Sequence, residues 1–213
     1  MEETTSREKI LKKIRNALIS KAENPYPSLD TESSVYHPIE DSLDITFAQE
    51  FTKASGQFIY CEDEFELKVN LTSLIAENNW EHIYCLDKNI KKILNDTGIP
   101  FSSEESSFAD MEVGITNCEF LIARLGSIMV SSKQTAGRRL NVFPPAHIVF
   151  AESSQIVPDI KQALQAIQEK YTNDLPSLIS VITGPSRTAD IEKTLVMGAH
   201  GPKNLFVFLL DKQ

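Results

Sequence analysis

Short apolar segments alternate with segments of helical periodicity over residues 43–98, and this order constrains the fold most. Residues 57–61 (QFIYC) and 82–86 (HIYCL) are short and apolar, which is typical of strands. Three segments around them repeat apolar residues at helical intervals: 43–56, 62–79 and 87–98. Gly56 and Gly98 are placed to end two of these helices. A strand–helix–strand–helix order predicts an α/β fold, with a parallel sheet and helices on both faces.

The second half of the chain continues with longer apolar runs. Strands are predicted at 111–116, 126–132, 146–152, 178–183 and 204–210. The runs at 178–183 and 204–210 are continuously apolar, which favours central strands buried on both faces. A helix is predicted over 158–171, with Pro158 in its first turn.

The N-terminal part has a different character. Residues 5–22 predict an amphipathic helix, because Thr5 and Glu8 have capping-box spacing and apolar residues follow at helical intervals. Residues 22–38 are rich in Pro, Ser and Asn, which predicts a linker. The predicted division is 1–42 for the helix and linker and 43–213 for the α/β domain. The helix is expected to pack either on its own domain or on a partner.

Charge and cysteine content exclude several classes of function. A formal charge of −9 over 213 residues argues against general affinity for nucleic acid or anionic membranes. The three cysteines, Cys61, Cys85 and Cys118, are fewer than the four thiolates of a usual iron–sulfur cluster. No set of residues has zinc-ligand spacing, so we expect no metal or cofactor on this chain. The N-terminus shows no apolar signal core and no run reaches the length of a membrane span, which predicts a cytoplasmic protein.

The stretch TGPSRTADIEKTLVMGAHGP, residues 183–202, concentrates turn residues and polar side chains. A predicted strand runs into Gly184, and a helix is predicted to begin directly after it. The first amides of a helix bind anions, and the Arg187 guanidinium adds planar donors for carboxylate or phosphate. The side chains expected at this helix start belong to Ser186, Thr188 and Asp190. An ordinary strand–helix turn with a surface arginine is the alternative.

His200 stands between Gly198 and Gly201, just before a predicted strand. A histidine on such a loop can transfer protons at neutral pH, although a structural histidine is the alternative. If the strands that end at Thr183 and start at Asn204 are neighbours, this histidine and the arginine share one rim. We therefore predict catalytic roles for His200, Asp190 and Arg187, and ligand contacts for Gly184, Ser186, Thr188 and Gly201.

The same residues carry a resemblance to a known family. GPSRTADIE, followed by GAHGP and a closing strand, resembles the signature of the LUD domain of lactate utilization proteins of the LutC/YkgG type. Upstream, ITNCEFLIARLGSIMV and RRLNVFPPAHIVF resemble two further family segments. The resemblance covers about residues 57–213. It implies a three-layer sandwich with a mostly parallel sheet, similar to the sugar-phosphate isomerase and CoA-transferase (NagB/RpiA-like) group.

The resemblance also implies a role in the oxidation of L-lactate to pyruvate, beside iron–sulfur oxidoreductase partner proteins. The clusters would reside on those partners, because this chain lacks the ligands. Two alternatives stay open: a stand-alone enzyme acting on a sugar phosphate or a CoA ester, and a pure assembly subunit.

One segment departs from the family pattern. Where the family has an Ala-Glu-Thr-Gly-Thr-like run, this chain reads ARLGS, with Arg124 at the glutamate position. An arginine cannot act as the carboxylate nucleophile that CoA transferases use, so we do not expect CoA transfer at this position. Arg124 is either a second cation for an acidic ligand or a surface residue. The ligand contacts that the resemblance implies here are Arg124, Gly126, Ser127 and His147.

Overall fold

The structure is a computed structural model that describes residues 5–19, 28, 36–191 and 194–212. The chain divides into two units, residues 1–38 and 39–213. In the first unit, α1 (Ser6–Ile19) begins at the predicted capping box. The Thr5 amide donates to Glu8 Oε2 at 2.9 Å, and the Glu8 amide donates to Thr5 Oγ1 at 3.3 Å. Most of the predicted linker lies outside the described residues.

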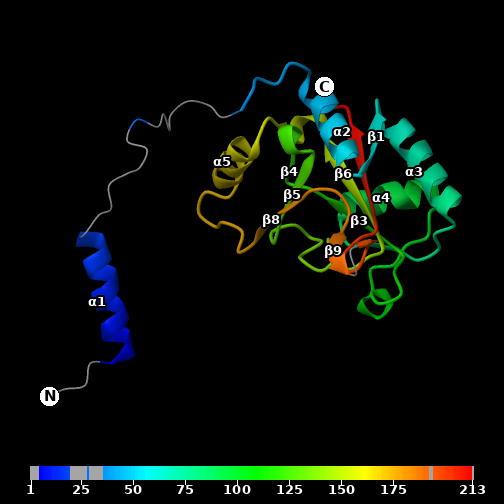
Figure 1. Cartoon of the computed structure of the whole chain (residues 1–213). Helices are drawn as coiled ribbons and strands as arrows, with labels where there is room; N and C mark the ends of the chain where they lie inside the picture. The colour runs from blue at the N-terminus through cyan, green and yellow to red at the C-terminus, as the bar shows by residue number, and fades with distance from the viewer. Residues whose placement is uncertain (1–4, 20–27, 29–35, 192–193, 213) are drawn as a thin grey trace. The chain divides into compact units, whose positions relative to one another are not determined.

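The second unit is built on a five-stranded sheet whose strands all run parallel (Figure 1). Their order is β1 (Gln57–Cys61), β11 (Asn204–Leu210), β6 (Ala146–Glu152), β3 (Val113–Asn117) and β2 (Ile83–Cys85). Along β11, Phe206 and Phe208 enter the core on one face, while Leu205, Val207 and Leu209 enter it on the other. Burial on both faces explains the continuous apolar run of this strand.

Helices α3 (Glu64–Asn78) and α4 (Lys88–Thr97) cover one face of this sheet. Their buried side chains are Leu67, Leu71, Ile75, Ile90 and Leu94. The carboxylates of Asp63 and Asp87 accept hydrogen bonds from the first amides of the two helices. Gly98 adopts the left-handed conformation and ends α4, as predicted.

The other face is covered by α2 (Leu43–Lys53) and by a second, four-stranded sheet. The order of that sheet is β7 (Ile156–Val157), β4 (Phe120–Ile122), β5 (Ser127–Ser131) and β8 (Ile179–Ile182). The rings of Phe47 and Phe51 on α2 stack with centroids 5.3 Å apart between the two sheets. Helix α5 (Ile160–Lys170) packs Ala163 and Ile167 on the far side of the second sheet.

The remaining described elements are short. They are the 3₁₀ turns η1 (Glu105–Ser107), η2 (Ala123–Leu125) and η3 (Ser153–Gln155), and the antiparallel pair β9 (Arg187–Ile191) and β10 (Thr194–Met197). No helix in the described part of the chain is long and apolar enough to cross a membrane. The predicted α/β architecture, with a mostly parallel central sheet flanked by helices, is confirmed.

Three local predictions are wrong. Strand β8 is not a central strand, because it pairs only with β5 and forms the edge of the second sheet. Pro158 precedes α5 instead of lying in its first turn, and the Asp159 side chain caps the helix. Ser55, with a φ of 71°, takes the left-handed position after α2 that was assigned to Gly56. Gly56 is needed for space, since a Cβ there would lie 2.4 Å from the Phe51 ring.

Gly126, which directly follows η2, is packed against the backbone of α2. It has a φ of +54°, and a Cβ built on it would lie 2.2 Å from the backbone nitrogen of Phe51. Gly98 has a similar φ of +70°, but a Cβ there would meet nothing within 4 Å. Substitutions at both glycines carry the cost of a left-handed backbone, but only a substitution at Gly126 adds a steric clash.

We predict that Gly126→Ala destabilises the domain more than Gly98→Ala does. The second change should lower the free energy of unfolding by about 1 kcal/mol, the cost of a left-handed alanine. The first should lower it by about 3 kcal/mol or more, because overpacking adds to that cost. Urea unfolding measures both changes. Equal losses in the two variants would show that α2 and η2 are not in tight contact.

Candidate functional site

The chain after Gly184 is not a helix. Residues 187–191 form β9, which pairs with β10 in an antiparallel hairpin. Arg187 lies opposite Met197 and Ile191 opposite Thr194, with a register shift between Thr194 and Val196. Thr188 and Asp190 therefore lie in a strand, and the predicted row of free helix amides does not exist. The segment contains the β-branched residues Thr188, Ile191, Thr194 and Val196, which fit a strand pair at least as well as a helix.

The hairpin does bring two of the predicted site segments together. The Ser186 amide donates to the carbonyl of Pro202 at 2.8 Å, and the Gly198 amide donates to the carbonyl of Ser186 at 2.9 Å. Arg187 and His200 are both exposed on these adjoining segments. Gly201 is packed against Ser186, because a Cβ on it would lie 3.1 Å from the serine Cβ.

The strands on either side of this segment, β8 and β11, are not neighbours, because they belong to different sheets. Gly184 is buried beneath the end of α2, and a Cβ on it would lie 2.1 Å from the carbonyl oxygen of Ala54. Ser127 is also buried, and its hydroxyl lies 2.7 Å from the Thr183 hydroxyl. Gly126 has the packing role described above. Arg124 lies in η2, and its amide donates to the carbonyl of Pro158 at 3.1 Å.

His147 is a core residue of β6. It is fully buried, and its Nε2 lies 2.8 Å from the Thr116 hydroxyl. Within the described part of the chain, its Nδ1 has no hydrogen-bond partner. Burial lowers the pKa of His147 to about 4, so the ring is neutral at physiological pH. The predicted ligand contact at His147 is therefore not available from the surface.

A cavity of about 670 Å³ lies instead at the carboxyl edge of the five-stranded sheet. Its lining includes Asn117, Glu152 and Leu210, which end β3, β6 and β11. Asp87 and Asn89, at the start of α4, also line it. The cavity therefore sits where three buried strands end and a helix begins.

The chain topology explains why a cavity forms there. Strands β1 and β2 lead into α3 and α4 on one face of the sheet, whereas β3 and β6 lead into β4 and η3 on the other. The connections that leave the neighbouring strands β2 and β3 thus diverge. In open α/β sheets, this switch point outside the carboxyl ends of the strands is where ligands bind. The cavity is thus the candidate functional site.

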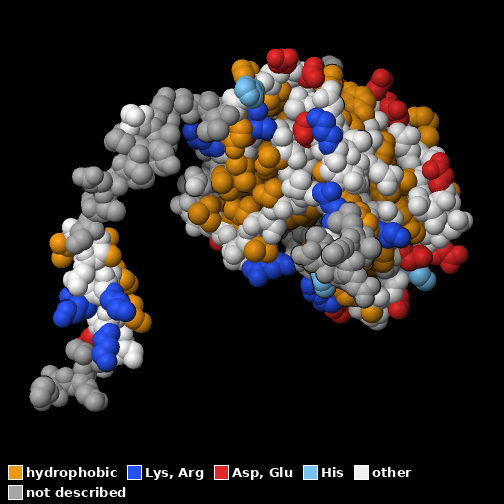
Figure 2. Space-filling view, in the orientation of Figure 1, with side chains coloured by type: hydrophobic (Ala, Val, Ile, Leu, Met, Phe, Trp, Pro, Cys, Tyr) orange, Lys and Arg blue, Asp and Glu red, His pale blue; other side chains and the backbone are white. Residues whose placement is uncertain are grey.

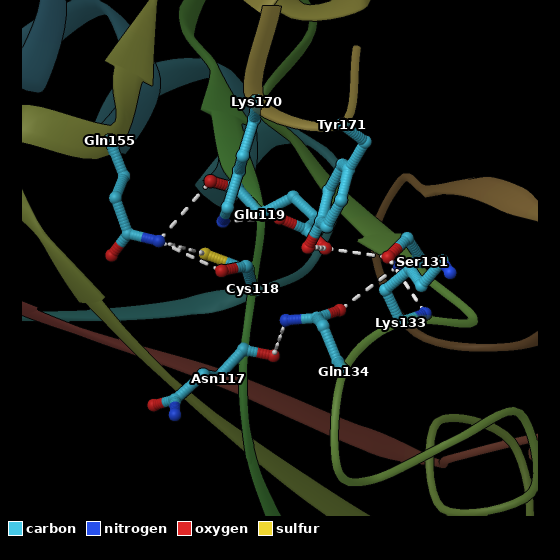
Figure 3. Close-up of polar contacts among 9 residues, drawn as sticks. All are labelled: Asn117, Cys118, Glu119, Ser131, Lys133, Gln134, Gln155, Lys170 and Tyr171. Carbon is cyan, nitrogen blue, oxygen red and sulfur yellow. Dashed lines mark hydrogen bonds and ion pairs between the residues drawn. The ribbon is translucent and has the colours of Figure 1, made fainter. Parts of the chain in front are cut away.

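Glu119 is the central polar residue beside the cavity (Figure 3). Although its side chain is only 1% exposed, three donors reach it. Its Oε1 accepts from the hydroxyls of Ser131 at 2.5 Å and Tyr171 at 2.9 Å, and its Oε2 accepts from Lys170 Nζ at 2.7 Å. The ion pair with Lys170 and two hydroxyl donors offset the cost of burying the charge.

Two glutamines hold the backbone around this cluster. Gln155 Nε2 donates to the carbonyls of Cys118 at 2.8 Å and Glu119 at 3.2 Å. Gln134 Nε2 donates to the carbonyl of Asn117 at 3.0 Å, and its Oε1 accepts from the Ser131 amide at 3.0 Å. The turn from β3 into β4 is therefore fixed from both sides, and with it the wall of the cavity (Figure 3).

The cavity is lined by both lysines and carboxylates, and the Glu119 cluster contributes hydrogen-bond donors that are already paired. Partial burial acts to lower the pKa of Lys170, but the hydrogen bond and charge of Glu119 outweigh it and raise that pKa. Burial and the hydrogen bond to Glu119 raise the pKa of Tyr171. At neutral pH the cluster thus presents an ammonium group and a neutral phenol. Lys133 also lines the cavity and pairs with Asp174, a carboxylate whose side chain is 82% exposed.

This arrangement can bind an anion more readily than it can act as a base. Glu119 already accepts three hydrogen bonds and is out of contact with solvent, so a ligand has little access to its oxygens. The Lys133 ammonium pairs with the exposed carboxylate of Asp174. Because such a surface ion pair is weak, a ligand carboxylate or phosphate can replace it.

Sequence reasoning missed the Glu119 cluster. The one signal was a glutamate inside the otherwise apolar run CEFLIA, because a charge in such a run is buried only when it is paired. Its partners Ser131, Lys170 and Tyr171 come from β5 and the end of α5, far away in the sequence. No local pattern links them.

The fold and cavity define an α/β protein with a candidate ligand site at the carboxyl edge of its sheet. The model of the LUD domain matches residues 45–210, and the chain belongs to this family, as the sequence resemblance predicted. A crystal structure of a DUF162 family protein from Deinococcus radiodurans has the same fold, with a TM-score of 0.59 and 17% identity. That likeness covers 79% of this chain and 96% of the other.

Curated relatives match over a shorter region. Lactate utilization protein C of Bacillus subtilis (strain 168) is 39% identical over 103 residues, which is 47% of this chain and 43% of that protein. Lactate utilization protein C 1 of Bacillus mycoides (strain KBAB4) is 33% identical over 119 residues, covering 54% and 51%. The chain spans about half the length of the curated relatives it matches.

We predict that His147 makes the protein less stable in acid. An unfolded histidine titrates near 6.5, whereas burial lowers the pKa of His147 in the fold to about 4. The unfolded chain therefore binds the proton first, and stability is lost as the pH falls from about 6.5 towards 4, by about 3 kcal/mol. Urea unfolding of the wild type and His147→Gln, from neutral pH to about pH 4, measures this loss as a change in their difference. A difference that is constant with pH would contradict a buried, neutral histidine.

Proposed function

We propose that this chain supports the oxidation of L-lactate to pyruvate, as a subunit without iron–sulfur clusters beside iron–sulfur oxidoreductase proteins. The observation that carries the proposal is the LUD-domain match over residues 45–210, together with relatives named lactate utilization protein C. The clusters are assigned to the partners, which makes this chain a binding component of the system.

The burial of the three cysteines supports the assignment of the iron–sulfur clusters to partner proteins. Cys61, Cys85 and Cys118 are all free and buried. Burial raises the pKa of Cys85 and of Cys118 to about 12, so neither thiol ionises at neutral pH. Thiolates are the form that ligates iron, and these sulfur atoms serve as small apolar side chains of the core.

The cavity at the carboxyl edge is the proposed binding site for a small carboxylate or a phosphorylated ligand. It lies at the topological switch point, and Lys133 and Lys170 stand on its wall. The hairpin is the second candidate, because the hydrogen bond between Ser186 and Pro202 places the segments of Arg187 and His200 side by side. A charge change at each site distinguishes the two.

We predict that Lys133→Met slows growth on L-lactate in a host strain deleted for this gene and complemented with the variant. Lys53→Met is the matched control, since Lys53 also forms a surface ion pair, with Glu50, but does not line the cavity. Losing either exposed pair costs little stability, so a growth defect confined to Lys133→Met reports on the site.

Two further results would redirect the proposal. A growth defect in Arg187→Ala or His200→Ala, with normal growth of Lys133→Met, would move the site to the hairpin. Normal growth of the deletion strain itself would contradict the role in lactate oxidation. In that case a thermal shift of the purified chain with a sugar phosphate or CoA would favour a stand-alone enzyme. A ligand at 100 times its dissociation constant stabilises by about 2.7 kcal/mol.

A further inference from the structure

Helix α1 carries an apolar stripe that the described residues of its own unit leave uncovered. No residue of this 14-residue helix is buried. The stripe combines large apolar side chains at helical spacing, all exposed: Ile10, Leu11, Ile14 and Leu18. The helix contains five lysines and arginines but one glutamate, which gives it a formal charge of +4. In Figure 2 the apolar side chains of α1 gather along one side of the helix and the basic ones beside them.

A helix of this length is marginal in water unless a surface covers its apolar stripe. The capping box already provides hydrogen bonds at the start of the helix. The stabilisation that α1 still lacks is therefore the burial of its apolar stripe. The surface that covers it must be apolar along one line and acidic at the sides, because the helix is basic.

The outward face of α3 has that chemistry. Phe65 is 75% exposed and Val69 is 46% exposed, one turn apart on the side away from the core. Thr72 and Ala76 continue the same line and are also exposed. Residues 62–78 contain five carboxylates against one lysine, a formal charge of −4. Among the described residues of the unit 39–213, Phe65 is the most exposed large apolar side chain.

We propose that α1 of one copy of this chain docks on the outward face of α3 of a second copy. The apolar stripe of α1 then covers Phe65 and Val69, and its lysines and arginines face the carboxylates of residues 62–66. Two copies that exchange helices bury two such contacts, which makes the assembly reciprocal. The inference concerns assembly and does not depend on the proposed role in lactate oxidation.

Two other occupants of the stripe fit less well. A pair of α1 helices would bring together two charges of +4, and that repulsion opposes association. An anionic membrane would attract α1, but residues 39–213 carry 15 basic against 24 acidic residues and would be repelled. Helix α1 also has no aromatic residue to anchor it at a lipid interface.

Sedimentation velocity of the full chain tests the proposal. The wild type should form a dimer at about 0.1 mM that dissociates as salt is raised, because opposite charges contribute to the contact. Ile14→Asp should weaken association at least about tenfold, because it places a charge in the stripe. Asn16→Asp is the matched control, since it makes a similar charge change on the opposite side of the same helix and should leave association nearly unchanged.

A mixing experiment tests reciprocity. Phe65→Asp should weaken association as Ile14→Asp does, and each variant alone keeps no intact α1–α3 contact. An equimolar mixture of the two variants keeps one intact contact per pair and should associate more tightly than either alone. A monomeric wild type, equal effects of Ile14→Asp and Asn16→Asp, or a mixture no tighter than its components would overturn the proposal. So would a monomeric wild type that binds phosphatidylserine vesicles through α1.

Discussion

Burial of the five-stranded sheet on both faces is the constraint on which the rest of the structure depends. In β6 and β11 successive side chains enter two different cores, one with α3 and α4 and one with α2 and the second sheet. Two-sided burial goes with parallel strands, and parallel strands place all their carboxyl ends at one edge. Because the connections diverge between β2 and β3, that edge opens into the cavity.

The Glu119 cluster ties this edge to the outer layers. A single buried carboxylate receives donors from β5 and from the end of α5, so it joins the second sheet and its covering helix to the end of β3. The same contacts hold Lys170 and Tyr171 at the wall of the cavity (Figure 3). Packing of the layers and the electrostatics of the site thus depend on the same residues, and substitutions at Glu119 affect both.

The geometry predicted for the segment after Gly184 is wrong for an identifiable reason. The rule that ligands bind beyond the carboxyl ends of parallel strands was applied to the strand before Gly184, which was taken as part of the main sheet. That strand, β8, runs antiparallel to β5 at the edge of the second sheet. Gly126 and Gly184, which were predicted as ligand contacts, allow close approach to the backbone of α2 and of Ala54 directly after it. Glycine-rich turns serve packing and ligand approach equally well, and the sequence does not separate the two uses.

The sequence by itself determined the α/β class, the strands of the main sheet, the capped helices α1 and α4, and the LUD family. These rest on local periodicity, on capping residues such as Thr5 and Gly98 and on contiguous motifs, all of which act over a few residues. Only the tertiary structure decided that β8 leaves the main sheet, that residues 187–191 and 194–197 pair as strands, and that Glu119 meets Lys170 and Tyr171. Those outcomes depend on contacts between residues far apart in the chain, whose energies no local pattern contains.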